Sequence, residues 1–415
     1  MSHPLRALRI LLVANTLPPR DVSGVGEQVL QLAAGLRETG CTVEVLGRGR
    51  DGVRGPKVLF PLFAVPAVWR ALRRFRPHVV QVHESDGGLA ALFVSLVASR
   101  LHPPPRLVAL LQVSYVEERR AVRPLVAAGQ VLGRPGSVER RFRWLKAPLQ
   151  IALGWLTARR ADLVLVPSAA TGAEIRRDYL GSRSTEPSVL PNVTGGLPVV
   201  LEEATGEAPG YFLFVGRLRI RKGVEVLLTA LRSLLMVHPT HLGHPETRLL
   251  IAGDGEHRAA LEQCAAELEL GSAVRFLGRC SAGRVRGLLR GARALVVPSI
   301  YEGMPLVVLE AMEAGLPVIA SAVSGIPEVV ADDPADDTRE RTGWLVPPED
   351  PERLAAALAA AIGDPDEARR RGEAGRRRVD EEFRPARAAA RWRMLVGGVG
   401  EIPERTETLK RGPLS

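Results

Sequence analysis

The chain has 415 residues, of which 46% are hydrophobic and 25% are charged, and its formal net charge at pH 7 is +10. This length predicts two or three domains, and short apolar runs of β type alternating with helical patterns favour an α/β protein. Its three cysteines, Cys41, Cys264 and Cys280, are spread singly. This spacing argues against a zinc site or a disulfide framework and favours a reducing, cytoplasmic compartment. Aromatic and basic residues do not alternate in the way that is typical of base stacking, which argues against nucleic acid as a partner.

The first predicted elements form a β–loop–α–β unit. Residues 8–14 are typical of a buried strand, and their apolar run is shorter than the core of a secretory signal. A helix is predicted over 27–38 and a second strand over 42–46. Gly24 and Gly26 lie in the loop at the helix N-terminus, where free N–H groups can bind an anion. The dinucleotide-binding spacing Gly-x-Gly-x-x-Gly is absent, and a tight turn that only needs glycine is the alternative.

Two polar residues follow the next predicted strands. His83 comes directly after the strand predicted over 77–82, and Gln112 lies near the end of the strand predicted over 107–113. Ligands of open α/β sheets bind beyond the carboxyl ends of strands, so both are candidate site residues. A solvated loop histidine is the alternative for His83. Gln112 can hydrogen-bond a hydroxyl group but cannot carry charge.

Residues 114–160 combine many arginines with apolar side chains, among them Trp144 and Trp155. The pattern predicts a basic amphipathic helix, which suggests contact with an anionic membrane surface through residues 119–160. The protein would then be peripheral at the inner face of the plasma membrane. The alternative is a solvated basic face over a packed helix. No apolar run reaches the ~20 residues that span a bilayer.

The second half restarts with a strand over 211–215, a basic glycine loop over 216–223 and a helix over 224–237. Gly216, Arg217 and Lys222 lie in this loop. Cations beside N–H donors at a helix start are suited to phosphate, although the Walker A spacing is absent. A basic surface turn is the alternative. Strands predicted over 248–252 and 274–277 follow, the first of them leading into Gly253 and Asp254.

Residues 295–321 predict a strand, a loop, a helix, a loop and a strand. Pro305 suits the first helical position, Glu302 lies in the loop and Glu310 in the helix. With a rise of ~1.5 Å per helical residue, Glu310 lies about 8 Å along the axis from Pro305. The two carboxylates are therefore expected to contact different parts of one extended ligand, with its anionic part at the helix N-terminus. Two solvated helix-start acids are the alternative.

The phrase EGMPLVVLEAMEAGLPVIAS at 302–321, together with GRLRIRKG at 216–223, resembles the signature of retaining GT-B glycosyltransferases of family 4, the glycogen-synthase and sucrose-synthase-like group. The resemblance implies two Rossmann-like, doubly wound domains that face a central cleft. It places the acceptor-side domain at 1–197 and the nucleotide-sugar domain at 210–384. A helix at 385–396 would return to the first domain, before a mobile tail at 397–415.

The resemblance also implies roles for particular residues. Glu302 would lie by the transferred sugar, Glu310 would bind the ribose, and Arg217 and Lys222 would hold the diphosphate. The implied catalytic set is Glu302, Arg217, Lys222 and His83. The implied donor-binding set is Gly24, Gly216, Gly253, Asp254, Arg275, Leu277, Gly303, Met304, Pro305, Leu306 and Glu310. Gly26 and Gln112 would lie on the acceptor side, Gln112 at a place where the family usually carries histidine.

The implied function is transfer of a sugar, with retention, from a nucleoside diphosphate sugar to a hydroxyl acceptor. That acceptor is expected to be a lipid-linked molecule, a cell-envelope glycan or a small molecule. No metal or other cofactor is expected for the chemistry. The alternatives are another GT-B enzyme, such as a phosphorylase or an epimerase, and a membrane-docked scaffold that binds a nucleotide without catalysis.

Overall fold

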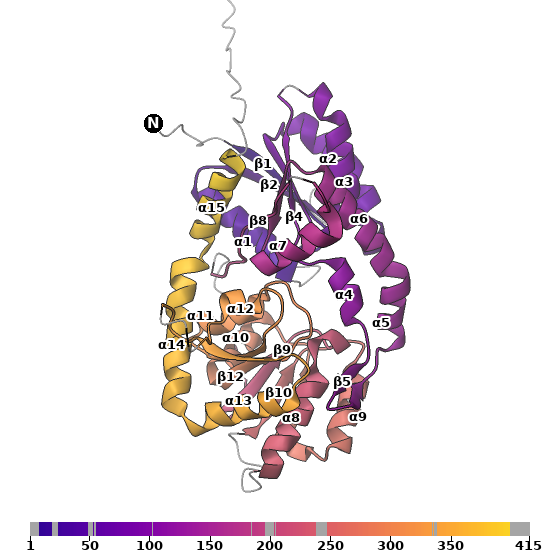
Figure 1. Cartoon of the computed structure of the whole chain (residues 1–415). Coiled ribbons are helices and arrows are strands. Elements are labelled where there is room, and N and C mark those ends of the chain that lie inside the picture. Colours follow the sequence, from indigo (N-terminus) through magenta and orange to yellow (C-terminus); the bar gives the residue numbers. More distant parts are fainter. Residues whose placement is uncertain are drawn as a thin grey trace, which may run out of the picture.

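The computed structural model describes residues 8–18, 24–48, 53, 55–101, 103–183, 185–195, 203, 205–237, 247–333, 335 and 338–398. Two α/β domains lie one above the other, each built on a six-stranded sheet (Figure 1). The tail predicted to be mobile lies outside the described residues from 399 onward, as do residues 196–202 and 204 near the predicted boundary between the domains. Within the described ranges, no helix is both long and apolar enough to cross a membrane.

The first sheet is parallel throughout, in the order β2-β1-β3-β4-β7-β8. Its strands are β1 (Arg9–Ala14), β2 (Thr42–Gly47), β3 (Val79–His83), β4 (Arg106–Leu110), β7 (Leu163–Val166) and β8 (Ser188–Val189). The helices of this domain include α1 (Gly24–Glu38), α2 (Phe60–Arg74), α3 (Gly88–Val97), α6 (Ala147–Arg160) and α7 (Ala169–Ile175). The inner strands are nearly continuous apolar runs because helices bury both faces of the sheet. The strand order reverses between β1 and β3.

The second sheet is also parallel, in the order β11-β10-β9-β12-β13-β14. Its strands are β9 (Tyr211–Val215), β10 (Leu249–Ala252), β11 (Val274–Gly278), β12 (Ala292–Val297), β13 (Val318–Ser321) and β14 (Gly343–Val346). Its helices include α8 (Val224–Val237), α9 (Arg258–Glu267), α10 (Ala282–Gly291), α11 (Leu306–Glu313), α12 (Ile326–Val329) and α13 (Pro351–Gly363). The order reverses between β9 and β12, which is where doubly wound sheets bind ligands. The doubly wound fold predicted from the sequence is confirmed for both domains.

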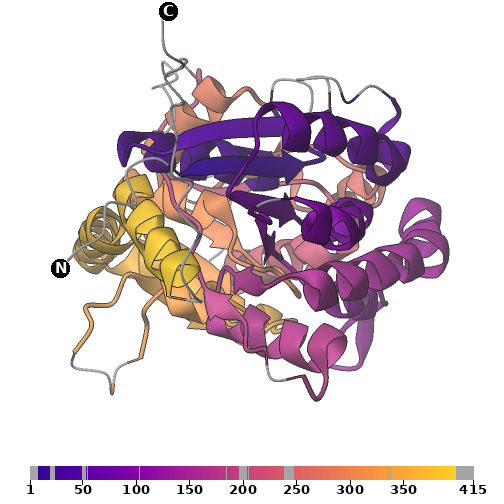
Figure 2. The same cartoon turned by 90° about the horizontal axis from the view of Figure 1, so that it is seen from above.

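Two helices at the end of the described chain connect the domains on one side, while α6 lies on the other side (Figure 2). α14 (Pro365–Glu382) packs on α11 of the second domain, and α15 (Pro385–Gly397) packs on α1 of the first. Trp392 of α15 is fully buried in the core of the first domain and donates its Nε1–H to Gln81 Oε1 at 2.6 Å. The last helix therefore belongs to the first core although it follows the second domain in sequence.

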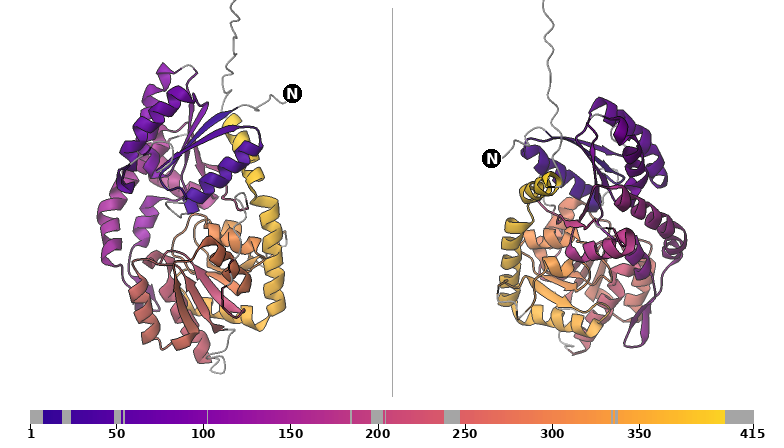
Figure 3. Two further views of the ribbon diagram at one scale, coloured as in Figure 1. Left: turned by 180° about the vertical axis from the view of Figure 1, so that it is seen from behind. Right: turned by 45° about the horizontal axis from the view of Figure 1, so that its top comes forward.

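The basic segment before α6 is not one amphipathic helix, so that prediction was wrong. It forms α4 (Tyr115–Ala121), an antiparallel hairpin of β5 (Leu125–Ala127) and β6 (Gln130–Gly133), α5 (Ser137–Arg141) and a π-helical turn (Phe142–Lys146) before α6. Pro124 interrupts the helical pattern, and Ala128 and Gly129 both adopt positive φ at the hairpin turn. We call residues 115–146 the bridge segment, because it descends from the first domain to lie beside α8 of the second (Figures 1 and 3).

Leu125 of the bridge segment is fully buried in the core of the second domain. A smaller difference concerns Pro305, which was expected at the first helical position. It caps α11 instead, with extended backbone at φ −72° and ψ 126°, and the helix begins at Leu306.

Candidate active site

The loops at the carboxyl ends of the two sheets meet between the domains. A Cβ added to Gly303, in the loop after β12, would lie 2.1 Å from the backbone oxygen of Gln112, which follows β4. Asn192 Nδ2 of the first domain donates to the Met304 backbone oxygen at 2.8 Å. Any larger residue at 303 would push the loops apart, so glycine is needed for this close approach.

Lys222 and Glu302 meet at the point where the second sheet reverses its order. The Lys222 ammonium donates to Glu302 Oε1, which also accepts from Ser299 Oγ at 2.8 Å. Arg221 Nη1 lies 3.8 Å from Glu302 Oε2. The Glu302 side chain is 8% exposed, so its charge is compensated by protein groups more than by water. The structure thus brings together two residues that the sequence placed in separate motifs.

The surroundings decide the charge state of this pair. Burial raises the pKa of Glu302, but the charges of Lys222 and Arg221 outweigh it and hold that pKa below its usual value. Burial also lowers the pKa of Lys222, against the opposing effect of Glu302. Glu302 is therefore an anion near neutral pH and cannot serve as a general acid. It is suited to accept hydrogen bonds from hydroxyl groups or to stabilise positive charge.

Backbone contacts fix the loop that carries Lys222. Gly223 has φ +64°, and a Cβ there would lie 2.0 Å from the Pro298 oxygen. Gly253 has φ +149°, and a Cβ there would lie 1.8 Å from the Gly216 oxygen. The loops after β9, β10 and β12 consequently pack main chain against main chain, which only glycine permits at these two positions.

Arg217 is exposed beside this loop and has no hydrogen-bonding or ion-pair partner in the part of the chain that the structure describes. Although the residue as a whole is exposed, partial burial of its guanidinium and the like charges of Arg219, Arg221 and Arg279 lower the pKa of Arg217, while Glu256 opposes them. Arg217 and its cationic neighbours thus form a surface suited to an anion of more than one charge, such as a diphosphate.

Glu310 lies on α11, where the two domains face each other. Gly24 at the start of α1 lies opposite Leu306 at the start of α11, since a Cβ on Gly24 would be 3.6 Å from Leu306 Cδ1. Burial and the charge of Glu27 raise the pKa of Glu310 to about 7, against the effect of Arg286. In the described ranges the Glu310 carboxylate has no hydrogen bond, so it is available to a ligand hydroxyl.

His83 lies in the core rather than at an open edge. It is 1% exposed, and its Nε2 is 3.0 Å from Gln81 Nε2, while its Nδ1 has no hydrogen-bond partner among the described residues. Burial lowers the pKa of His83 to about 3, so the imidazole is neutral. Gln81 also binds Trp392, which makes His83 part of a buried polar chain beneath the site.

Gln112 is engaged by Asn192 through two amide hydrogen bonds of 2.9 Å. Its backbone N–H donates to Glu84 Oε1 at 2.8 Å. Glu84 was not predicted as a site residue; it is buried, its φ is +62°, and burial raises its pKa to about 8. The signal was present, because Glu84 follows directly on the end of β3. Glu84 and Asn192 hold Gln112 against the Gly303 loop.

Of the remaining predicted site residues, some lie at the carboxyl ends of the strands and one does not. Gly26 approaches the Thr16 oxygen closely, and Asp254 accepts from the N–H of Gly255 at 2.9 Å. Leu277 lies near the carboxyl end of β11, where Gly253 N–H donates to the Gly278 oxygen. Arg275 lies earlier in the same strand and its guanidinium binds Glu207 at 2.7 Å, away from this edge. No cluster of three or more metal-ligating side chains occurs in the described ranges.

The bridge segment adds a buried group of charges that sequence analysis also missed. Glu139 Oε1 accepts from the Ile220 N–H at 2.6 Å, and Glu139 Oε2 lies 3.6 Å from His257 Nδ1. The other imidazole nitrogen contacts Glu225. Burial lowers the pKa of His257, but the hydrogen bond and charge of Glu225 outweigh it and leave the pKa above its usual value. The bridge segment is thereby attached to the loop that carries Lys222.

Comparison with known proteins gives matches over both halves of the chain. The model described as "Glycosyltransferase Family 4" matches residues 22–193, and "Glycosyl transferases group 1" matches residues 202–378. Glycogen synthase of Mycobacterium tuberculosis (strain ATCC 25618 / H37Rv) is 28% identical over 91% of each chain. Alpha-maltose-1-phosphate synthase of Mycolicibacterium smegmatis is 28% identical over 91% of this chain and 95% of the relative.

Solved structures share the fold at lower identity. A sucrose-phosphate synthase from Thermosynechococcus elongatus has a TM-score of 0.68 at 23% identity, covering 94% of this chain and 99% of that one. The catalytic domain of starch synthase IV from Arabidopsis thaliana, bound to ADP and acarbose, has a TM-score of 0.68 at 15% identity with the same coverage. Anabaena HepE with UDP-glucose has a TM-score of 0.63 at 17% identity, covering 94% and 100%.

Proposed function

The chain belongs to the GT-B glycosyltransferases, with a family 4 domain before a group 1 domain, and from this we propose that it transfers a sugar, with retention, from a nucleoside diphosphate sugar to a hydroxyl acceptor. The observation that carries the proposal is the Lys222–Glu302 pair at the reversal point of the second sheet, beside Arg217. Bound UDP-glucose and ADP in two proteins of the same fold support a nucleotide donor.

The charges account for the chemistry. When the glycosidic bond breaks, negative charge develops on the β-phosphate of the leaving nucleoside diphosphate. We propose that Arg217, with its cationic neighbours, and Lys222 stabilise it without a metal ion. The acceptor hydroxyl attacks on the face from which the phosphate departs and gives its proton to that phosphate. Glu302 stays ionised beside the sugar, where it accepts hydrogen bonds and offsets positive charge on the ring.

Glu310 gives the nucleotide affinity a pH dependence. We propose that its carboxylate accepts hydrogen bonds from the ribose hydroxyls. With a pKa of about 7, roughly one molecule in ten is ionised at pH 6 and nine in ten at pH 8, so affinity for the free nucleoside diphosphate should rise about tenfold over this range. Calorimetry at the two pH values measures this affinity. Glu310→Gln is the control, because the titration of the nucleotide itself changes the affinity of both proteins alike. Equal pH dependence in the two proteins would contradict the assignment.

A surface of aromatic and basic side chains supports contact with an anionic membrane at the inner face of the plasma membrane. Trp144 and Trp155 are exposed. The guanidinium of Arg119 lies 5.7 Å and that of Arg143 lies 5.6 Å from the Trp144 ring, and Arg159 lies 4.4 Å from the Trp155 ring. Indole rings at headgroup depth with cations on lipid phosphates would produce reversible binding. A lipid-linked or cell-envelope acceptor would be met there by a cytoplasmic enzyme.

Vesicle binding tests this surface. The protein should sediment with anionic vesicles at low salt and be released at high salt, because screening shortens the range of the attraction. Trp144→Ser with Trp155→Ser should weaken the binding, whereas Met394→Ser, an exposed apolar residue of α15, should leave it unchanged. A wild-type protein that stays in the supernatant at low salt would make a soluble acceptor the better proposal.

A panel of nucleotide sugars, scored by thermal unfolding, tests the function itself. A donor at about a hundred times its Kd should stabilise the folded state by ~2.7 kcal/mol, and incubation with that donor should release the nucleoside diphosphate. Stabilisation without release would favour a non-catalytic nucleotide-binding scaffold, and no stabilisation by any donor would refute a nucleotide-sugar site.

A further inference from the structure

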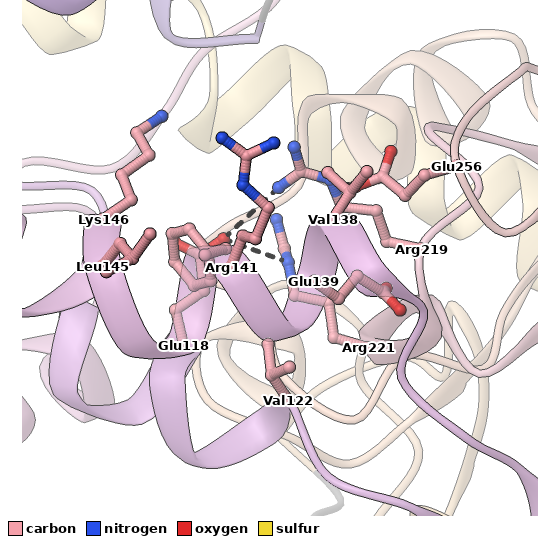
Figure 4. A pocket seen from close by; sticks show the side chains of 11 residues that line it. Glu118, Val122, Val138, Glu139, Arg141, Leu145, Lys146, Arg219, Arg221 and Glu256 are labelled. Carbon is pink, nitrogen blue, oxygen red and sulfur yellow. Dashed lines mark ion pairs between the residues drawn. The ribbon is translucent and has the colours of Figure 1, made fainter.

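A pocket of about 290 Å³ lies between the bridge segment and the second domain (Figure 4). Its bridge side includes Phe142, Leu145 and Lys146, and its second-domain side includes Arg219 and Arg221. No motif of the sequence pointed to it, because the two walls are far apart in the chain.

The pocket has more positive charge than its own acids compensate. Glu118 lies between Arg219 and Arg221 at 3.8 and 3.3 Å, as the dashed lines in Figure 4 show. Glu256 lies 3.1 Å from Arg219, and Glu139 is occupied by the Ile220 N–H and His257.

Arg141 and Lys146 also line the pocket and are exposed. Across the described ranges, neither has a hydrogen bond or an ion pair to an acid. Two cations are therefore free to bind an anionic group that enters the pocket.

Another part of the pocket wall is apolar. Val122, Val138, Phe142 and Leu145 line the same pocket. Val138 and Leu145 are 52% and 69% exposed, which costs free energy unless something covers them. Cations beside an exposed apolar wall are complementary to an anionic amphiphile, a molecule with a charged head and an apolar body.

The pocket adjoins the Lys222–Glu302 pair through one side chain. Arg221 lines the pocket, with Nε 3.3 Å from Glu118, and the same guanidinium approaches Glu302 to 3.8 Å. A molecule in the pocket would thus be separated from Glu302, beside which we place the sugar in the proposed function, by the Arg221 side chain.

We propose that this pocket binds the acceptor and that the acceptor is an anionic amphiphile with a phosphate-type head group. The head group binds Arg141 and Lys146, and the apolar body lies on Val138 and Leu145. The inference rests on the proposed glycosyl transfer and names the class of acceptor for it. It is separate from the membrane surface, since it requires a defined pocket rather than a charged face.

Calorimetry with dodecyl phosphate monomers tests the pocket. Wild-type protein should bind this probe, and Arg141→Ala with Lys146→Ala should weaken it about 30-fold, by analogy with cations near anionic surfaces. The matched control, Arg134→Ala with Arg140→Ala, removes the same charge from bridge residues outside the pocket and should bind like wild type. Val138→Ser with Leu145→Ser should weaken dodecyl phosphate but leave inorganic phosphate unchanged.

Several results would overturn the inference on their own. One is an equal loss of dodecyl phosphate affinity in Arg141→Ala with Lys146→Ala and in the control. Another is an unchanged dodecyl phosphate affinity in Arg141→Ala with Lys146→Ala, and another is wild-type protein that binds inorganic phosphate as tightly as dodecyl phosphate. Nucleoside diphosphate affinity should be the same in all these variants. Wild-type protein that releases nucleoside diphosphate from a donor but does not bind dodecyl phosphate would refute the pocket alone and leave the proposed transfer standing.

Discussion

Lys222→Ala is expected to lower the turnover of sugar transfer by about 10²- to 10³-fold at saturating donor. Lys222 is a partly buried cation of the loop that we propose faces the diphosphate, so alanine would leave the charge developing on the leaving phosphate uncompensated. The magnitude is that of a lost oxyanion donor, ~3–4 kcal/mol. Initial rates of nucleoside diphosphate release measure the effect.

The variant also removes a partner from a buried carboxylate. Glu302 keeps Arg221 at 3.8 Å and Ser299, so the fold should persist with a lower unfolding temperature, and circular dichroism checks this. Arg217→Ala should also slow transfer, but it should not lower the unfolding temperature, because Arg217 is exposed. Arg140→Ala, an exposed arginine on α5, is the control. Near-normal turnover in both Lys222→Ala and Arg217→Ala would refute their roles.

Glu302→Gln should lower turnover by about 10²-fold while nucleoside diphosphate affinity stays within about threefold of wild type. The amide keeps the shape of the side chain but removes the negative charge that Lys222 and Arg221 hold in place. Because we propose that this charge acts on the sugar and not on the nucleotide, the loss should appear in kcat.

Glu310→Gln serves as the matched comparison, since it changes a second carboxylate of the same loop and helix. It should weaken nucleotide binding and affect turnover at saturating donor less. Calorimetry with the free nucleoside diphosphate separates the two variants. Loss of nucleotide affinity in Glu302→Gln with none in Glu310→Gln would show that the roles are reversed.

The local parts of the fold could be predicted because they depend on short-range patterns. The strand before Glu302, the helix after it and the next strand follow from apolar β runs, a proline and a glycine. The structure places them at β12, α11 and β13. The basic loop before α8 follows from the same kind of pattern. Lys222 and Glu302 were predicted to make separate contacts, and their pairing has no local signal because they are 80 residues apart.

Long-range packing explains what was missed. The bridge segment was interpreted as one basic helix, since its composition shows charges but not their partners. Leu125 enters the core of the second domain and Glu139 binds Ile220 N–H, and neither contact has a local signature. His83 was predicted from its place after a strand. The structure buries it in contact with Gln81, which Trp392 binds from 311 residues away.

The anomeric proton of the donor sugar, followed by NMR, tests the central proposal most directly. With the donor that stabilises the protein best, and with water in place of the unidentified acceptor, one nucleoside diphosphate should be released per sugar. For an α-linked donor, the α-anomer of the free sugar should appear first, before mutarotation, and Lys222→Ala should slow both signals equally. The β-anomer appearing first, or no release from any donor, would contradict retaining transfer at the Lys222–Glu302 pair.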